Sequence, residues 1–92
     1  MANAATAGFS IQRMVKFDGD GTLRAFCDLV VGELFVIKGL RVVNGRKGLF
    51  VSMPRQQGKD TKWYDSVEQM TPEVKKEVDH VVLEAYQQAN QD

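Results

Sequence analysis

The sequence is short of the residues from which metal centres and disulfides are built. It contains one cysteine, Cys27, and one histidine, His80, among 92 residues. A single cysteine cannot form an intramolecular disulfide, which is typical of a protein in the reducing cytoplasm. One cysteine and one histidine also cannot supply the usual soft ligands of a zinc site. We therefore expect no metal and no other cofactor.

Catalytic constellations are missing as well. Cys27 falls on the apolar side of a predicted strand, where a small buried side chain is typical, and His80 lies beside the apolar stripe of a predicted helix, where a solvated histidine is typical. The segments "GDG" and "GRKG" neither open a helix nor end in the Lys-Ser/Thr pair of a phosphate-binding loop. No base–nucleophile pair is visible. The sequence predicts that the protein is not an enzyme and has no small-molecule substrate; a small hydrolase or transferase is the alternative with least support.

Long apolar runs are absent too. The runs present are too short to span a bilayer, so no membrane partner is expected. The first residues, "MANAATAG", lack the basic region and apolar stretch of a secretory signal. We interpret residues 1–8 as a flexible tail and residues 9–92 as a single small domain, located in the cytoplasm.

What the sequence does contain is a succession of strand patterns. Alternation in residues 9–17 puts Phe9, Ile11, Val15 and Phe17 on one face, and the second run puts Leu23, Ala25, Cys27, Leu29 and Val31 on one side. Further strands are predicted at residues 34–43, 49–53 and, as a short fifth strand, 62–67. Glycine-containing turns separate the first four strands, and Gly39 predicts a β-bulge inside the third.

The end of the chain changes to helical periodicity. Thr71 is suited to cap the helix, Pro72 to its first turn, and Glu73 to the positive end of the helix dipole. The predicted apolar stripe consists of Val74, Val78, Val81, Val82, Ala85 and Ala89. The predicted fold class is therefore α+β, an antiparallel β-meander of four to five strands followed by a C-terminal amphipathic helix.

One helix covers only part of such a sheet. Apolar side chains are expected on or near the less covered face, namely Phe26, Val30, Phe35, Ile37, Val43 and Phe50. Leaving so much apolar surface in water is unfavourable, and a second copy of the chain would cover it. We expect a homodimer formed through the sheet.

The formal net charge is zero, but the charges are unevenly distributed. Residues 38–62 hold seven cations against Asp60: Lys38, Arg41, Arg46, Lys47, Arg55, Lys59 and Lys62. Cations concentrated in this way are typical of a phosphate-binding surface. The alternative is two solvated faces of opposite charge that attract each other.

We take Arg46 and Lys47, at a hairpin tip, and Arg55, Lys59 and Lys62, in the following loop, as candidate phosphate contacts. The two groups begin at opposite ends of the sheet, so one continuous patch needs a folded-back loop or a second subunit. Trp63 and Tyr64 adjoin the loop and could stack on a base. A tryptophan in such a position more often packs on the core.

A competing surface is the predicted helix. Lys75 and Lys76 lie off the apolar stripe and could face outward together, although acidic residues surround them. Electrostatics favours the loop over the helix as the main contact.

Three segments carry a family resemblance: "GLRVVNGRKGLFVSMP" at 39–54, "MVKFDGDGTLRAF" at 14–26 and "VVLEAY" at 81–86. With them the chain resembles the SpoVG family (stage V sporulation protein G, also called septation protein) from about Ile11 to Tyr86. The resemblance implies a bacterial cytoplasmic regulator that dimerises through its sheet. It also implies site-selective binding of DNA and RNA, with effects on gene expression, sporulation or septation in cell division.

The sequence departs from the family pattern at two places. Only Arg55 is basic directly after "MP", and glutamines follow where lysine or arginine is common; the family's "HP" before the helix is replaced by "QMTPE". The resemblance implicates the polar helix face, hence Lys75 and Lys76. The expected function is a homodimeric nucleic-acid-binding regulator; the alternative is a protein-interaction module in cell division that acts through its sheet edge.

Overall fold

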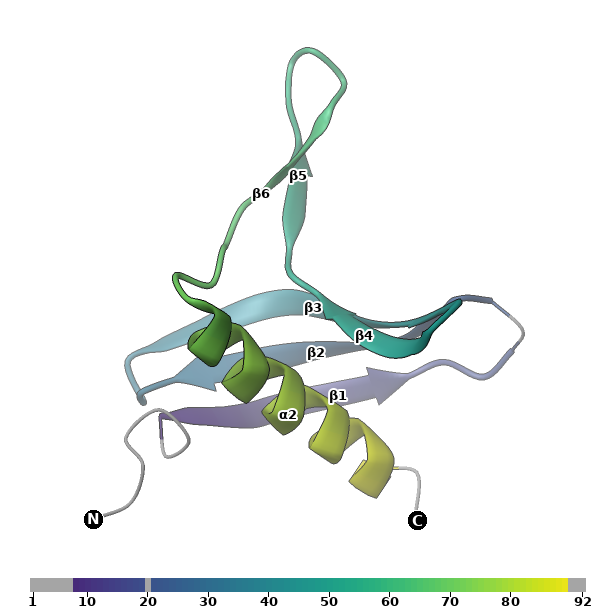
Figure 1. The fold of residues 1–92 in the computed structure, drawn as a ribbon, viewed down its shortest axis with the longest axis vertical. Helices are drawn as coiled ribbons and strands as arrows, with labels where there is room; N and C mark the ends of the chain where they lie inside the picture. The colour runs from purple at the N-terminus through teal and green to yellow at the C-terminus, as the bar shows by residue number, and fades with distance from the viewer. Residues whose placement is uncertain (1–7, 20, 90–92) are drawn as a thin grey trace.

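The protein is described by a computed structural model that covers residues 8–19 and 21–89. Its elements are the strands β1 (Phe9–Lys16), β2 (Leu23–Val31), β3 (Phe35–Gly45), β4 (Gly48–Ser52), β5 (Arg55–Gln57) and β6 (Trp63–Asp65), and the helix α2 (Pro72–Ala89) (Figure 1). Apart from Gly8, the predicted tail lies outside the described residues. No helix in the described part of the chain is long and apolar enough to cross a membrane.

The first four strands form one antiparallel sheet in the order β1-β2-β3-β4, which confirms the predicted meander. The predicted fifth strand is present as β6, but it pairs with β5 in a separate two-stranded sheet. The segment expected to be a loop at 55–62 therefore begins with a strand. Pro54 separates β4 from β5, because proline has no N–H group with which to continue the ladder.

Three register shifts in the four-stranded sheet, at Gln12, Arg24 and Gly39, set which side chains face the core. Gly39 is the extra residue between the pairs Asp28–Lys38 and Cys27–Leu40, with a φ of +88°, and this confirms the predicted bulge. A second bulge lies at Gln12, between the pairs Ile11–Leu29 and Arg13–Asp28.

The bulge at Gln12 overturns part of the predicted alternation. Beyond it, Met14 pairs with buried Cys27 and packs against the core, whereas Val15 pairs with Phe26. Val15 and Phe17 were expected on the face of Ile11, and this is wrong because the extra residue reverses every later side chain. Phe17 instead makes an edge-on contact with Phe26, with ring centroids 5.2 Å apart.

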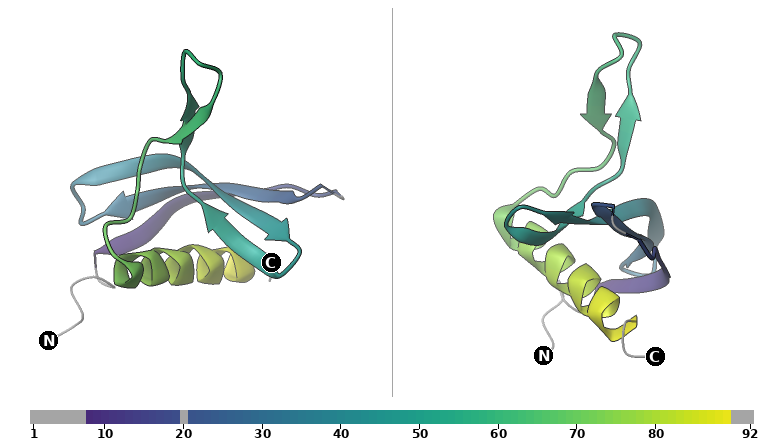
Figure 2. Two further views of the ribbon diagram at one scale, coloured as in Figure 1. Left: turned by 45° about the horizontal axis from the view of Figure 1, so that its top comes forward. Right: turned by 90° about the vertical axis from the view of Figure 1, so that its right-hand side faces the viewer.

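The core lies between α2 and one face of the four-stranded sheet (Figures 1 and 2). Its buried members are Ala25, Cys27, Leu29, Leu40, Val42, Val51, Val78, Val82 and Tyr86. Each fully buried large apolar side chain contributes about 1.5–3 kcal/mol. Ile37 packs against this core, so its expected place on the uncovered face is wrong.

The helix begins as predicted. Thr71 Oγ1 accepts a hydrogen bond from the Val74 N–H at 3.1 Å, which satisfies one of the unpaired donors of the first turn. Val78 and Val82 of the predicted stripe are buried, and Tyr86, outside that stripe, is buried with them. The ammonium of Lys16 lies 4.4 Å from the centroid of the Tyr86 ring.

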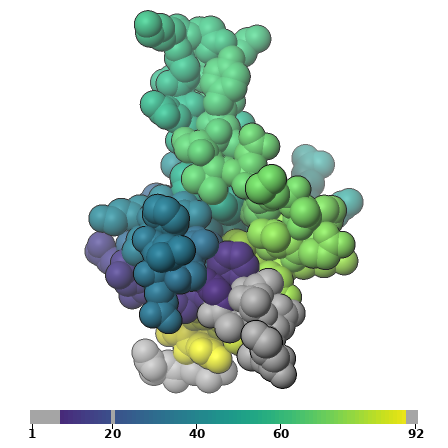
Figure 3. Space-filling model, turned by 90° about the vertical axis from the view of Figure 1, so that its left-hand side faces the viewer, coloured from purple at the N-terminus to yellow at the C-terminus, as the bar shows by residue number. Residues whose placement is uncertain are grey.

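The β5–β6 hairpin projects from the rest of the domain (Figures 1 and 2). The space-filling view shows it standing clear of the sheet and helix below it (Figure 3). A two-stranded ribbon in this position exposes both of its faces, and all six residues of its strands are exposed.

Candidate nucleic-acid interface

The seven predicted phosphate contacts are all exposed, and they occupy three places. Arg46 and Lys47 form the two-residue turn between β3 and β4, closed by the pair Gly45–Gly48. Arg55, Lys59 and Lys62 belong to the β5–β6 hairpin, and Lys75 and Lys76 lie in the first turns of α2.

These places are well separated within one chain. The β3–β4 turn lies at the right of Figure 1, the tip of the β5–β6 hairpin at the top, and the start of α2 at the left. The hairpin extends away from the sheet and is not folded back onto the β3–β4 turn. Within one chain the predicted cations do not form a continuous patch, so the second-subunit route to such a patch stays a prediction.

Asp60 organises the tip of the β5–β6 hairpin. Its carboxylate accepts hydrogen bonds from the Tyr64 hydroxyl and from the Lys62 N–H, the latter at 3.1 Å. The Tyr64 hydroxyl, followed by the Lys62 amide, lowers the pKa of the Asp60 carboxyl, which keeps it ionised. The tip thus holds Lys59 and Lys62 in an ordered loop, with one negative charge between them.

Two of the seven cations form ion pairs. Arg55 Nε lies 3.2 Å from Asp65 Oδ1, directly across the hairpin, and Lys75 Nζ lies 2.8 Å from Asp79 Oδ2 on α2. The other five have no carboxylate partner among residues 8–19 and 21–89: Arg46, Lys47, Lys59, Lys62 and Lys76. Among the seven cations of residues 38–62, only Arg55 pairs with a carboxylate of residues 63–89, so neutralisation of the cationic segment by that part of the described chain is limited to one exposed pair.

A cleft at the base of the hairpin brings together residues that the sequence did not connect. Its volume is about 280 Å³, and Arg41, Arg55 and Trp63 line it. Trp63 is 55% exposed, so the expectation that it packs on the core is wrong. The reason is that β6 pairs with β5, away from the main sheet.

Arg41 was not among the predicted contacts. It pairs with Ser52 across β3 and β4, and the chain then reaches Arg55 three residues later. The Arg46–Lys47 turn sets this register. The Gly39 bulge in the β2–β3 pairing places Arg41 on the face opposite Leu40, which a pattern of alternating residues alone does not show. The sequence carried no signal for the β5–β6 pairing that completes the cleft.

Exposed apolar side chains gather at the opposite part of the sheet. Leu34, Phe35 and Val36 lie at and after the β2–β3 turn, and Phe35 is 69% exposed. Together with Val30 they line a shallow hollow of about 330 Å³. This apolar cluster lies partly on the sheet face that α2 does not cover.

The single cysteine and histidine are placed as the sequence predicted. Cys27 is buried, and its burial, with the Asp28 charge as a smaller cause, raises the pKa of the thiol to about 11. His80 is exposed, with Nε2 3.8 Å from Glu84 Oε2. Within the described residues, no group of three or more His, Cys, Asp or Glu side chains could hold a metal ion.

The fold and the candidate interface define a small α+β protein: a four-stranded meander with one helix on one face, and cations in the β3–β4 turn and on one projecting hairpin, β5–β6. Comparison with known proteins identifies its relatives. The family model for SpoVG matches residues 10–88. The chain belongs to the SpoVG family.

Two relatives illustrate the similarity. One, from Archaeoglobus fulgidus, is 38% identical over 76 residues, which cover 83% of this chain and 89% of the relative. The other, from Listeria monocytogenes serotype 4b, is 30% identical over 80 residues, covering 87% of this chain and 78% of the relative. Their names are "Putative septation protein SpoVG" and "Putative septation protein SpoVG 2".

Proposed function

We propose that the protein is a cytoplasmic, homodimeric nucleic-acid-binding regulator and not an enzyme. It would bind DNA or RNA and act on gene expression, sporulation or septation; the names of its relatives give septation. The observation that carries the proposal is the set of five exposed cations without carboxylate partners in the described chain, two of which lie in the β3–β4 turn and two in the tip of the projecting β5–β6 hairpin. Unpaired lysine and arginine side chains on a convex support are suited to reach phosphates.

The proposed contacts are Arg46, Lys47, Arg55, Lys59 and Lys62, with Lys75 and Lys76 as a secondary set. Lys75 would leave Asp79, a partly buried carboxylate, whereas Arg55 would exchange an exposed carboxylate partner, Asp65, for a phosphate. Exposed ion pairs contribute at most about 1 kcal/mol, so this exchange costs little. Contacts of this kind position a nucleic acid but carry little sequence information, which has to come from base contacts or shape.

A homodimer formed through the sheet supports this function. Only one face of the sheet is covered by α2, and Val30 and Val36, which pair with each other on the other face, are apolar side chains that lie partly in water. A second copy that covered them would also place a second set of hairpins beside the first. That arrangement would join cations that are separate within one chain.

The apolar cluster also favours a second candidate function. Leu34, Phe35 and Val36 follow one another at a turn, and such a contiguous exposed patch is typical of protein-binding surfaces. In this candidate the protein is an interaction module in cell division and does not bind nucleic acid directly.

The test neutralises the tip of the β5–β6 hairpin with Lys59→Gln and Lys62→Gln together. Affinity for duplex DNA and for single-stranded RNA is measured by fluorescence anisotropy over a range of salt concentrations. Because each lost phosphate contact changes the log–log salt slope by about 0.7–0.9, we expect the double variant to have a slope shallower by roughly 1.4–1.8.

The matched control is Arg13→Gln with Lys38→Gln, which removes the same charge from β1 and β3, away from the proposed phosphate contacts; because both residues lie on the uncovered sheet face, light scattering verifies that this variant keeps the mass of the original protein. This control should leave the slope nearly unchanged. Equal slopes for the hairpin variant and the original protein would contradict the assignment of the hairpin tip. Absence of binding to both nucleic acids at low salt would favour the interaction module.

A further inference from the structure

The cleft at the base of the β5–β6 hairpin combines two guanidinium groups with an exposed indole ring. We propose that Arg41, Arg55 and Trp63 bind one unpaired nucleotide, whose base stacks on the indole and whose phosphate is bound by the two arginines. This inference rests on the proposed function and deepens it, because it names single-stranded nucleic acid as the preferred ligand of the hairpin.

The indole is available for stacking. Trp63 is 55% exposed, and its backbone is fixed by pairing with Gln57 in the hairpin. Its side chain is therefore presented by a strand and not by a loose loop. Aromatic side chains on strands are the usual platforms for the bases of single strands, and such a base contact changes affinity by roughly 5- to 150-fold.

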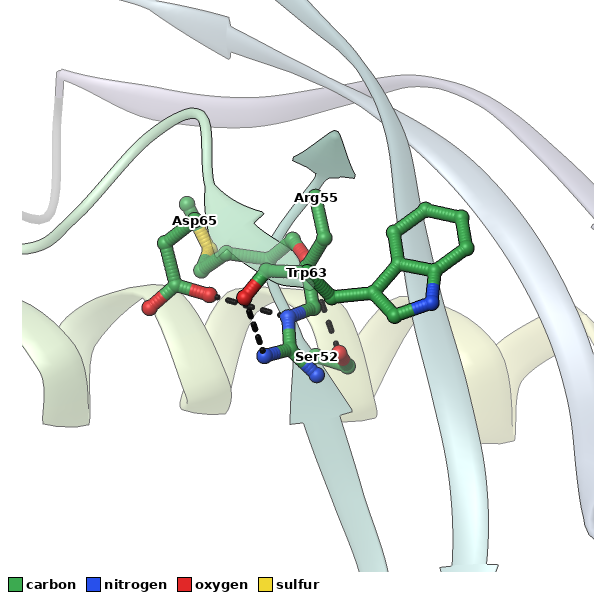
Figure 4. Close-up of polar contacts among 5 residues, drawn as sticks. Ser52, Arg55, Trp63 and Asp65 are labelled. Atoms are coloured by element: carbon green, nitrogen blue, oxygen red, sulfur yellow. Dashed lines mark hydrogen bonds and ion pairs between the residues drawn. The ribbon is translucent and has the colours of Figure 1, made fainter. Parts of the chain in front are cut away.

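The Arg55 guanidinium is held in place at one side of the cleft. Its Nε lies 3.2 Å from Asp65 Oδ1, and its Nη2 donates to the Trp63 carbonyl oxygen at 3.4 Å. In the view of Figure 4 the Asp65 carboxylate and the indole lie on opposite sides of this guanidinium. Arginine carries five N–H donors, so these contacts leave donors of Arg55 for a ligand.

The Arg41 guanidinium is held on the face of the sheet that α2 does not cover. Its Cζ lies 5.6 Å from the centroid of the Phe26 ring, and it has no carboxylate partner in the described chain. The cleft is therefore net positive: two arginines are offset by one exposed Asp65. Planar guanidinium groups bind the oxygens of a phosphate or a carboxylate in bidentate geometry.

The combination favours an unpaired nucleotide over a duplex. In a duplex each base is stacked between its neighbours, so its face is not available to an indole. The cleft of about 280 Å³ is close to the lower limit of small-ligand sites, which suits one nucleotide and not a helical groove. An acidic peptide would satisfy the arginines but would leave the indole without a stacking partner.

Trp63 is the only tryptophan of the chain, so its fluorescence reports directly on this cleft. The experiment titrates the full-length protein with four ligands: an oligothymidylate of about 16 nucleotides, an abasic strand of equal length, a duplex and polyglutamate. We expect the oligothymidylate to quench Trp63 and to bind roughly 5- to 150-fold more tightly than the abasic strand. The duplex should bind through its phosphates without comparable quenching.

A series of variants then tests whether the base-dependent part of the affinity comes from Trp63 and the phosphate-dependent part from Arg41. Binding of labelled strands is measured by anisotropy for Trp63→Phe, Trp63→Leu and Arg41→Gln. Affinity for oligothymidylate should fall from Trp to Phe to Leu, while affinity for the abasic strand stays constant along this series. Arg41→Gln should lower the affinity for both the oligothymidylate and the abasic strand. Circular dichroism of Trp63→Phe, which keeps an aromatic ring, shows whether the fold is retained.

The outcomes separate this inference from the proposed function. Equal binding of the base-containing and abasic strands, with no effect of Trp63→Leu, overturns the stacking site and leaves phosphate binding intact. Binding of no nucleic acid overturns both proposals. Stronger quenching by polyglutamate than by oligothymidylate overturns the nucleotide site in favour of an acidic peptide.

Discussion

At the scale of the residue, Cys27 shows how position determines chemistry. It pairs with Met14 on one side and Leu40 on the other, in the centre of the sheet, and is 2% exposed. Burial disfavours the thiolate, so the pKa of the thiol rises from 9.0 to about 11. A thiol in this state is a packing group and a poor nucleophile at neutral pH.

The raised pKa makes stability depend on pH in a defined window. Because the folded state holds the thiol proton more tightly than the unfolded state, the stabilisation is fully present below pH 9 and is lost as pH rises toward 11. A shift of this size corresponds to about 2–3 kcal/mol at most. Urea unfolding from pH 8 to 11 should show the decline. Cys27→Ala should show a shallower decline, and identical pH profiles would contradict the assignment.

Single residues also show why part of the core was predictable. The alternation in β2 identified Ala25, Cys27 and Leu29, all buried, because this central strand pairs on both sides. In β1 the same reasoning failed after Gln12, since a bulge without glycine leaves no signal in the residues themselves. Gly39 was recognised as a bulge because glycine, which has no Cβ, readily adopts the positive φ that it has here.

At the scale of the element, a helix or strand could be predicted only where its residues show a cap or an apolar periodicity. The helix was placed from Thr71, Pro72 and its apolar periodicity, and α2 runs from Pro72 to Ala89. Strand β5 was missed because Arg55, Gln56 and Gln57 are polar and show no alternation. Its pairing with β6 depends on the backbone, and both faces of the ribbon are in water. For that reason the cleft of Arg41, Arg55 and Trp63 was also beyond sequence reasoning.

The Thr71 cap gives a prediction for the helix. Thr71→Ala removes the acceptor of the Val74 N–H, so the free energy of unfolding should fall by about 0.5–2 kcal/mol. Urea denaturation followed by circular dichroism measures it. Thr22→Ala, another exposed threonine that precedes a strand, serves as the matched control and should have a smaller effect. If both variants unfold at the same urea concentration, the side chain of Thr71 contributes no capping energy.

At the scale of the whole molecule, the main feature is that one helix covers only one face of a four-stranded sheet. The helix side is closed by the core around Leu29, Leu40 and Val82. The opposite face combines apolar side chains with cations, among them Phe26 beside Arg41. The marked separation of charge along the sequence and this uncovered face are both consistent with a molecule that works as an assembly.

The proposed homodimer can be tested by its mass in solution. Light scattering at micromolar concentration should give twice the chain mass of 10.3 kDa. Phe35→Glu places a charge in the exposed apolar cluster, where burial against a second copy would require desolvation, and should shift the mass toward the monomer. Met70→Glu is the matched control, because Met70 is 93% exposed and belongs to the segment between β6 and α2. A dimer unaffected by Phe35→Glu would move the interface to another surface, and a monomeric original protein would remove the dimer from the proposed function.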